Sequence, residues 1–116
     1  MPTYTQRTFY EGTPGTSSGI LATVPAGEEW LLDEVVANNT TGTAATLTLN
    51  HVPAGGSVAT GNQLASAVSV AANVDVQVLP NPPAGISLKA GDTIRGLQGT
   101  GSALNVRIMG RVRQFG

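Results

Sequence analysis

His51 is the one histidine in this chain of 116 residues, which contains no cysteine. A nucleophilic triad combines a serine or cysteine with a histidine and a carboxylate, and Asp92 and several serines supply the other residue types. We identify no G-x-S-x-G elbow or other local signature that would support such a triad. His51 also has no second histidine or cysteine with which to share a metal ion. We therefore interpret His51 as a structural histidine at a strand end or in a loop.

The densest carboxylates are the pairs Glu28-Glu29 and Asp33-Glu34. Paired carboxylates can perform acid–base chemistry or bind Ca²⁺, but the spaced Asp and Asn ligands of a calcium loop are missing. No P-loop or G-x-G-x-x-G phosphate motif is present either. We interpret these four residues as a solvated acidic edge. The sequence thus predicts no catalytic, cofactor-binding or metal-binding residue, and a protein that is not an enzyme.

The composition of the chain argues against several further classes of protein. Hydrophobic residues make up 41% of the chain and charged residues 11%, with a net charge of −1, which is too apolar and too weakly charged for a disordered protein. No apolar run approaches the length of a membrane-spanning helix. A nucleic-acid partner is not expected, because phosphate binding needs clustered lysine and arginine. Residues 1–7 lack a basic segment followed by an apolar one, so we expect no secretory signal.

The elements that would position any site are short strands. Residues 103–113 alternate between apolar and polar side chains, which is the period of a strand with one buried face. The apolar side is Leu104, Val106, Ile108 and Val112, and the polar side is Asn105, Arg107, Met109, Arg111 and Arg113. Similar alternation over residues 45–50 and 74–78, with no helical periodicity elsewhere, predicts an all-β chain.

Gly, Pro and Asn clusters divide the chain into eight or nine short strands. The expected strands are about 4–10, 19–24, 29–38, 43–51, 63–71, 73–79, 85–89, 93–97 and 103–113. This number favours a two-sheet sandwich of jelly-roll type over an up-and-down barrel. Between Leu31 and Val36 the apolar pattern changes phase, which indicates a bulge, a strand buried on both faces, or a short helix.

Charge is segregated along the sequence. Residues 1–75 carry a net charge of −5 and residues 76–116 a net charge of +4. The two halves could pair between adjacent strands of one sandwich, or acidic surface on one copy could meet basic surface on the next. Arg107, Arg111 and Arg113 share one strand face and form the most plausible contact patch.

Aromatic residues are concentrated near the start of the chain. Tyr4, Phe9 and Tyr10 are three of only five, and aromatic anchors often supply the binding energy of interfaces. We expect residues 1–18 to form an arm or edge strand that docks on its own sandwich or on a neighbour, and residues 19–116 to form a single domain. Tyr4, Arg7, Phe9 and Tyr10 join the three arginines as predicted interface residues.

Four segments resemble small virion structural proteins of tailed bacteriophages. They are residues 23–32 (TVPAGEEWLL), 37–49 (ANNTTGTAATLTL), 88–96 (LKAGDTIRG) and 103–110 (ALNVRIMG). The resemblance covers about residues 20–113 and implies a β-sandwich displayed in many symmetric copies. It transfers no catalytic residue.

The leading hypothesis is a capsid decoration, or cement, protein. It would be made in the host cytoplasm, reside in the virion, bind the major capsid protein or another virion protein, and self-associate, with a trimer as the favoured form. One alternative is a tail, neck or fibre-associated protein. Another is a carbohydrate-binding sandwich, which requires an exposed aromatic platform built from Tyr4, Tyr10 or Trp30.

Overall fold

The computed structural model describes residues 4–58, 63–77, 87–99, 101 and 103–114. This part of the chain is all β and contains no helix, and therefore none long and apolar enough to cross a membrane. Its nine strands are β1 Tyr4–Gly12, β2 Gly19–Thr23, β3 Glu28–Asn39, β4 Ala45–Val52, β5 Gln63–Val70, β6 Asp75–Gln77, β7 Ser87–Leu88, β8 Thr93–Gln98 and β9 Leu104–Gln114. The predicted turn at residues 81–83 lies outside the described residues.

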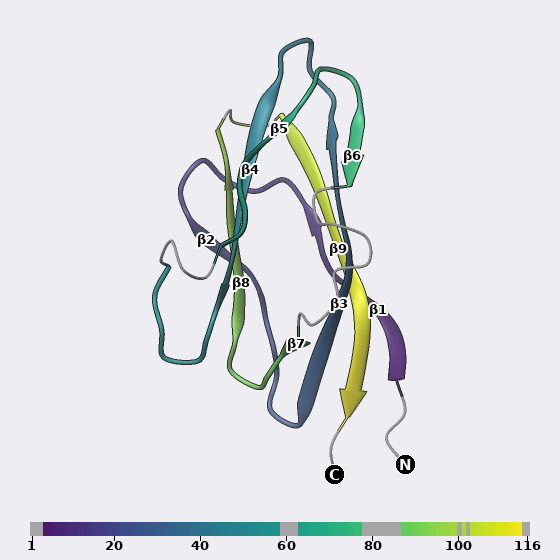
Figure 1. Ribbon diagram of the computed structural model, residues 1–116, viewed down its shortest axis with the longest axis vertical. Helices are drawn as coiled ribbons and strands as arrows, with labels where there is room; N and C mark the ends of the chain where they lie inside the picture. Colours follow the sequence, from purple (N-terminus) through teal and green to yellow (C-terminus); the bar gives the residue numbers. More distant parts are fainter. Residues whose placement is uncertain (1–3, 59–62, 78–86, 100, 102, 115–116) are drawn as a thin grey trace.

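The strands form two antiparallel sheets that pack face to face (Figure 1). The first sheet has the order β1-β9-β3-β6, with β7 also paired to β3, and the second has the order β2-β8-β4-β5. The chain crosses repeatedly from one sheet to the other, so strands adjacent in sequence are seldom neighbours in a sheet. This is the strand order of a jelly roll, and the predicted two-sheet sandwich is confirmed.

The core lies between the sheets and follows from the alternation in the strands. On β9 the predicted apolar side chains Leu104, Val106, Ile108 and Val112 are all buried, whereas the intervening side chains face outward. Leu47 and Leu49 of β4 meet them from the second sheet as members of the same apolar cluster. Burial of these side chains is the main favourable contribution to folding.

The phase change in β3 is a bulge. The pairing of β3 with β9 shifts register between Leu32 and Glu34, so that Asp33 is the extra residue. Trp30 and Leu32 before the bulge, and Val35 after it, therefore all point into the core. The helix alternative is excluded, because the whole segment is a strand.

Two buried amide side chains fasten loops to the sandwich. Gln98 accepts hydrogen bonds from the backbone N–H groups of Ala103 and Leu104, at 3.0 and 2.8 Å, and donates to the carbonyl of Pro14. Asn39 donates to the carbonyls of Thr43 and Val70, at 2.9 and 3.0 Å. Because a buried polar group without a partner is costly, these residues fix the loop conformations around them.

The N-terminal segment is an edge strand of its own sandwich. β1 pairs antiparallel with β9, and a register shift between Thr8 and Tyr10 leaves Phe9 as a bulge residue. The Phe9 ring stacks on Trp30, with centroids 4.1 Å apart and an interplanar angle of 3°. Of the two docking modes expected for residues 1–18, the structure has β1 on its own sandwich.

Candidate functional site

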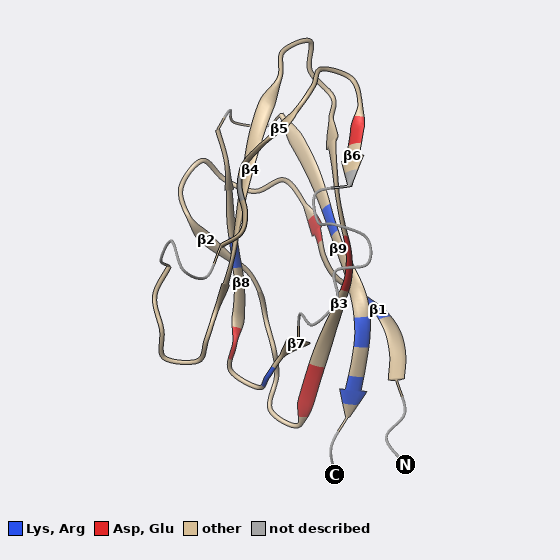
Figure 2. Cartoon of the chain, in the orientation of Figure 1, with Lys and Arg blue, Asp and Glu red and all other residues tan. Residues whose placement is uncertain are grey.

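The outer face of the first sheet brings together the basic strand β9 and acidic residues of its two neighbours (Figure 2). The ion pairs are Arg107 with Glu11 of β1 at 3.0 Å, Arg111 with Asp33 of β3 at 3.1 Å, and Arg113 with Glu29 of β3 at 3.5 Å. The Arg111 pair is bidentate, because Nε and Nη2 of the guanidinium donate to the two carboxylate oxygens of Asp33, each at 3.1 Å. The separation of charge in sequence is therefore used to join strands within one chain.

This pairing changes how the predicted arginine patch is understood. The three arginines line up on β9 as expected, but each contacts a carboxylate of its own chain, because β9 lies between β1 and β3 in the sheet. Arg107 and Arg111 remain exposed to solvent. The contact of these arginines with a partner protein stays a prediction. Such a partner would compete for them with the carboxylates of Glu11 and Asp33.

The predicted aromatic anchors separate into two groups. Tyr4 is 43% exposed and lies under the guanidinium of Arg111, 5.7 Å from ring centroid to cation. Phe9 and Tyr10 instead pack against the buried core, and burial raises the pKa of the Tyr10 hydroxyl. Trp30 is only 5% exposed. Tyr4 is thus the one exposed aromatic side chain among the described residues, which leaves a sugar-stacking platform with a single ring.

Arg7 lies at the sheet edge beside the start of β3. Its guanidinium pairs with Glu28 at 3.1 Å, and the same carboxylate accepts a hydrogen bond from the Trp30 indole at 3.0 Å. The Trp30 bond is the largest cause that lowers the pKa of Glu28, and Arg7 adds to it. Arg7 therefore connects β1 to the start of β3 through Glu28, next to the Trp30 ring on which Phe9 stacks.

Two adjoining depressions cross the outer face of the first sheet. One has a volume of about 400 Å³ and lies among β1, β3 and β9, and the other, about 310 Å³, extends toward β6. Both are lined by Met109 and Glu34, which are direct partners across β9 and β3. Arg107 turns toward β1 and Arg111 toward β3, so Met109 lies uncovered between them as an apolar floor.

Glu34 differs from the other carboxylates near it. Glu11, Glu29 and Asp33 each have an arginine partner, whereas no ion pair or hydrogen bond involves the side chain of Glu34 in the part of the chain that the structure describes. Asp75, at the far side of the second depression, accepts a hydrogen bond from Asn38 but has no cation beside it. From the sequence, Glu34 is expected in a solvated acidic edge, because local sequence does not show which of the carboxylates pair with an arginine.

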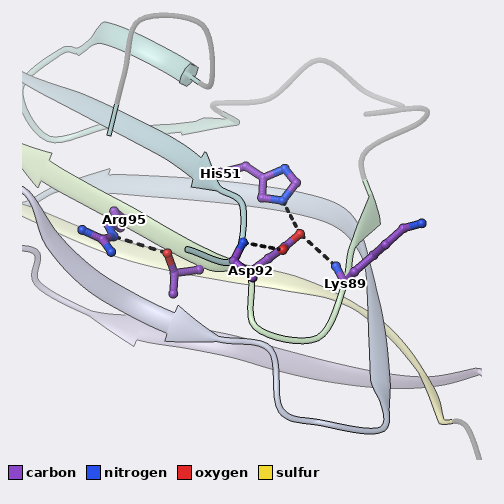
Figure 3. A network of polar contacts seen from close by, with 6 residues as sticks. His51, Lys89, Asp92 and Arg95 are labelled. Atoms are coloured by element: carbon purple, nitrogen blue, oxygen red, sulfur yellow. Dashed lines mark hydrogen bonds and ion pairs between the residues drawn. The ribbon is translucent and has the colours of Figure 1, made fainter. Parts of the chain in front are cut away.

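His51 lies at the other candidate location and pairs with Asp92 (Figure 3). The ring Nε2 is 2.7 Å from the Asp92 carboxylate, which also accepts hydrogen bonds from the backbone N–H groups of Ala54 and Lys89, at 3.1 and 3.0 Å. Burial by itself raises the pKa of Asp92, but these hydrogen bonds outweigh it and hold the pKa below its usual range. The pair ties the loop after β4 to the turn before β8.

Among the described residues, the contacts shown for the His51–Asp92 pair are with backbone N–H groups and not with a serine hydroxyl. Residues 15–19 read GTSSG and match the letters of the G-x-S-x-G motif, a match that sequence reasoning passed over. They form an exposed loop leading from β1 into β2, not a strand-to-helix turn. Among the described residues there is also no cluster of three metal-ligating side chains.

Comparison with known proteins indicates a shared fold. No family model matches the chain, and no curated protein matches it. A solved structure of Bacillus endospore appendages, described as a novel family of disulfide-linked pili, matches 99% of this chain and 90% of its own with a TM-score of 0.52. The sequences are 17% identical. The chain is a β-sandwich of the same general architecture.

Proposed function

We propose that this chain is a structural protein of a tailed-phage virion that decorates the capsid as a symmetric oligomer. The resemblance of residues 20–113 to small phage virion proteins supports the proposal, as does the jelly-roll strand order, an architecture common in viral capsids. The observation that carries it is the long edge formed by β1.

β1 ends the first sheet and pairs with β9 alone among the described strands. An edge strand presents a row of backbone N–H and C=O groups to which another chain can add a strand. Natural edges are usually protected by charge or proline, yet the stretch from Tyr4 to Tyr10 has no proline and only Arg7 as a charge. β1 is therefore suited to receive a strand from a shell protein.

Oligomerisation would strengthen such a contact. Several linked copies bind a shell with high avidity even when each strand addition is weak, provided that the symmetry of the oligomer matches that of the shell. The protein then clamps neighbouring shell subunits, which is the action expected of a cement protein. No reactive side chain is required for this role.

The proposal is tested by adding a charge to the edge. Thr5→Lys places a lysine on the exposed edge of β1, and Thr23→Lys makes the same change on β2, the edge of the second sheet. With purified capsids of the encoding phage, we expect Thr5→Lys to weaken binding about ten-fold or more, because each site of a multivalent complex is affected. Thr23→Lys should bind like the unaltered protein, and equal binding by both variants would contradict the role of β1.

A tail or fibre subunit is the second candidate. The fold shared with a pilus protein supports it, since that neighbour belongs to the pili of endospore appendages. This chain has no cysteine, so any fibre that it forms would lack the disulfide links of those pili. Cryo-electron microscopy of whole virions separates the candidates, because density on the shell supports decoration and density on the tail supports the second.

A further inference from the structure

The charges of this chain balance within the molecule except at four residues. Four of the five arginines form ion pairs within the chain, which are Arg7–Glu28, Arg107–Glu11, Arg111–Asp33 and Arg113–Glu29, and Asp92 contacts His51. The charged groups without an opposite charge beside them are Glu34, Asp75, Arg95 and Lys89. All thirteen acidic and basic side chains lie in the described part of the chain.

The unbalanced charges lie on different sides of the sandwich. Glu34 and Asp75 line the depressions on the outer face of the first sheet. Arg95 is on β8 of the second sheet, where its neighbour Ile94 points into the core and Arg95 therefore points outward. Lys89 is exposed in the turn before β8 (Figure 3). The outer face of the first sheet thus has an excess of acidic side chains, and that of the second sheet carries Arg95, while Lys89 lies in the connection from β7 of the first sheet to β8 of the second.

The second face also carries an exposed apolar side chain. Ile20 of β2 is 57% exposed and is paired directly with Arg95 of β8. Within the described part of the chain, the Arg95 guanidinium has one polar contact, with the Thr93 hydroxyl at 3.3 Å. Ile20 and the half-buried Arg95 form an apolar and cationic pair on this face, while Met109 and Glu34 form an apolar and anionic pair that lines the depressions on the other face.

We infer that the outer face of the second sheet binds the outer face of the first sheet in another copy of this chain, with Ile20 against Met109 and Arg95 paired with Glu34. The apolar contact removes both side chains from water, and the ion pair selects the orientation. The inference concerns contact between copies and does not depend on a role in a virion.

Such a contact uses two different surfaces of each copy. Heterologous contacts of this kind close into a ring, of which a trimer is a small example, or continue as an open chain of subunits. A two-fold dimer, in contrast, uses the same surface twice. Sedimentation velocity of the purified protein at increasing concentration therefore shows whether copies associate, and whether they form a dimer, a closed ring or a growing chain of subunits.

The test uses neutral substitutions at the two charges. We expect the unaltered protein to associate, and Glu34→Gln or Arg95→Gln each to weaken association about ten-fold or more, because each leaves the opposite charge without a partner in the contact. Glu29→Gln and Arg113→Gln are matched controls, since these two residues pair with each other within the chain and line neither depression. Amide spectra by NMR show that each variant is folded.

Mixing the two variants gives the decisive result. A Glu34→Gln copy keeps an intact Arg95 face, and an Arg95→Gln copy keeps an intact Glu34 face, so each mixed pair has one contact with both charges in place and the mixture should associate more strongly than either variant alone. A protein that stays monomeric up to about 1 mM, near the limit of weak specific association, would overturn the inference. So would association that neither variant weakens. Loss of capsid binding in Thr5→Lys is independent of these outcomes.

Discussion

Single buried polar residues fix the irregular parts of this molecule. Asp92 is the clearest case, because one carboxylate receives hydrogen bonds from His51, Ala54 and Lys89, which come from separate segments. A carboxylate that accepts several hydrogen bonds is stabilised in its charged form. His51 thus acts as one of several donors that hold this carboxylate, which agrees with a structural histidine at a strand end.

The lowered pKa of Asp92 predicts a pH dependence of stability. A carboxyl whose pKa is lower in the folded than in the unfolded state contributes stability above the unfolded pKa and loses it as pH falls through the folded pKa. We expect Asp92→Asn to lower the free energy of unfolding at pH 7 by about 2 kcal/mol or more, because the amide brings donors toward the Ala54 and Lys89 N–H groups.

Urea titrations between about pH 7 and pH 2.5 check this expectation. The difference in unfolding free energy between the unaltered protein and Asp92→Asn should shrink as the pH falls below about 4, where the unfolded carboxyl becomes protonated. A difference that stays constant over that range would show that the Asp92 charge does not contribute.

At the scale of elements, the position of β1 depends on a close contact at Gly110 of β9 as well as on the hydrogen bonds between β1 and β9. Gly110 of β9 has no side chain, and the Phe9 ring covers it on the way to its stack with Trp30. A Cβ at position 110 would lie 2.1 Å from the backbone oxygen of Leu31 and 2.7 Å from the Phe9 ring. β1, β9 and β3 therefore fit together only with glycine there.

Gly110→Ala should consequently destabilise the protein. The Leu31 oxygen belongs to the sheet backbone and cannot move cheaply, so we expect a loss of about 3 kcal/mol or more. Gly42→Ala is the matched control, because a Cβ there meets nothing within 4 Å. Thermal unfolding followed by circular dichroism measures both, and an equal melting temperature for the two variants would contradict the close approach.

At the scale of the whole molecule, one apolar cluster joins the two sheets. Trp30, Leu32 and Ile108 of the first sheet and Leu47 and Ile94 of the second belong to it. Neither sheet can keep its inner face buried without the other. The sandwich is therefore expected to unfold as a single cooperative unit.

Trp30 is the only tryptophan and reports on this cooperativity. Because it is buried between Phe9 and the core, its fluorescence should change together with the far-ultraviolet circular dichroism during urea unfolding. Coincident midpoints are the expected result. If the fluorescence changed at clearly lower urea, β1 would be detaching before the rest of the sandwich unfolds.

The sequence by itself determined the local structure. Alternation at residues 103–113 predicted the buried face of β9. The phase change after Leu31 indicated a bulge, a strand buried on both faces or a short helix, and the structure has the bulge, at Asp33. These features depend on the period of two in a strand and on local turn chemistry, which neighbouring residues are sufficient to define. The same reasoning placed His51 at the end of a strand.

Only the tertiary structure decided which distant residues meet. Arg111 lies 78 positions from Asp33, and His51 lies 41 positions from Asp92, so no local pattern could pair them. The order β1-β9-β3 places the basic strand between two acidic ones and leaves Glu34 without a partner. The segregation of charge in the sequence allowed ion pairs within one chain or between two chains. The strand order shows that ion pairs form within the chain, and it leaves Glu34 and Arg95, from which we infer the contact between chains.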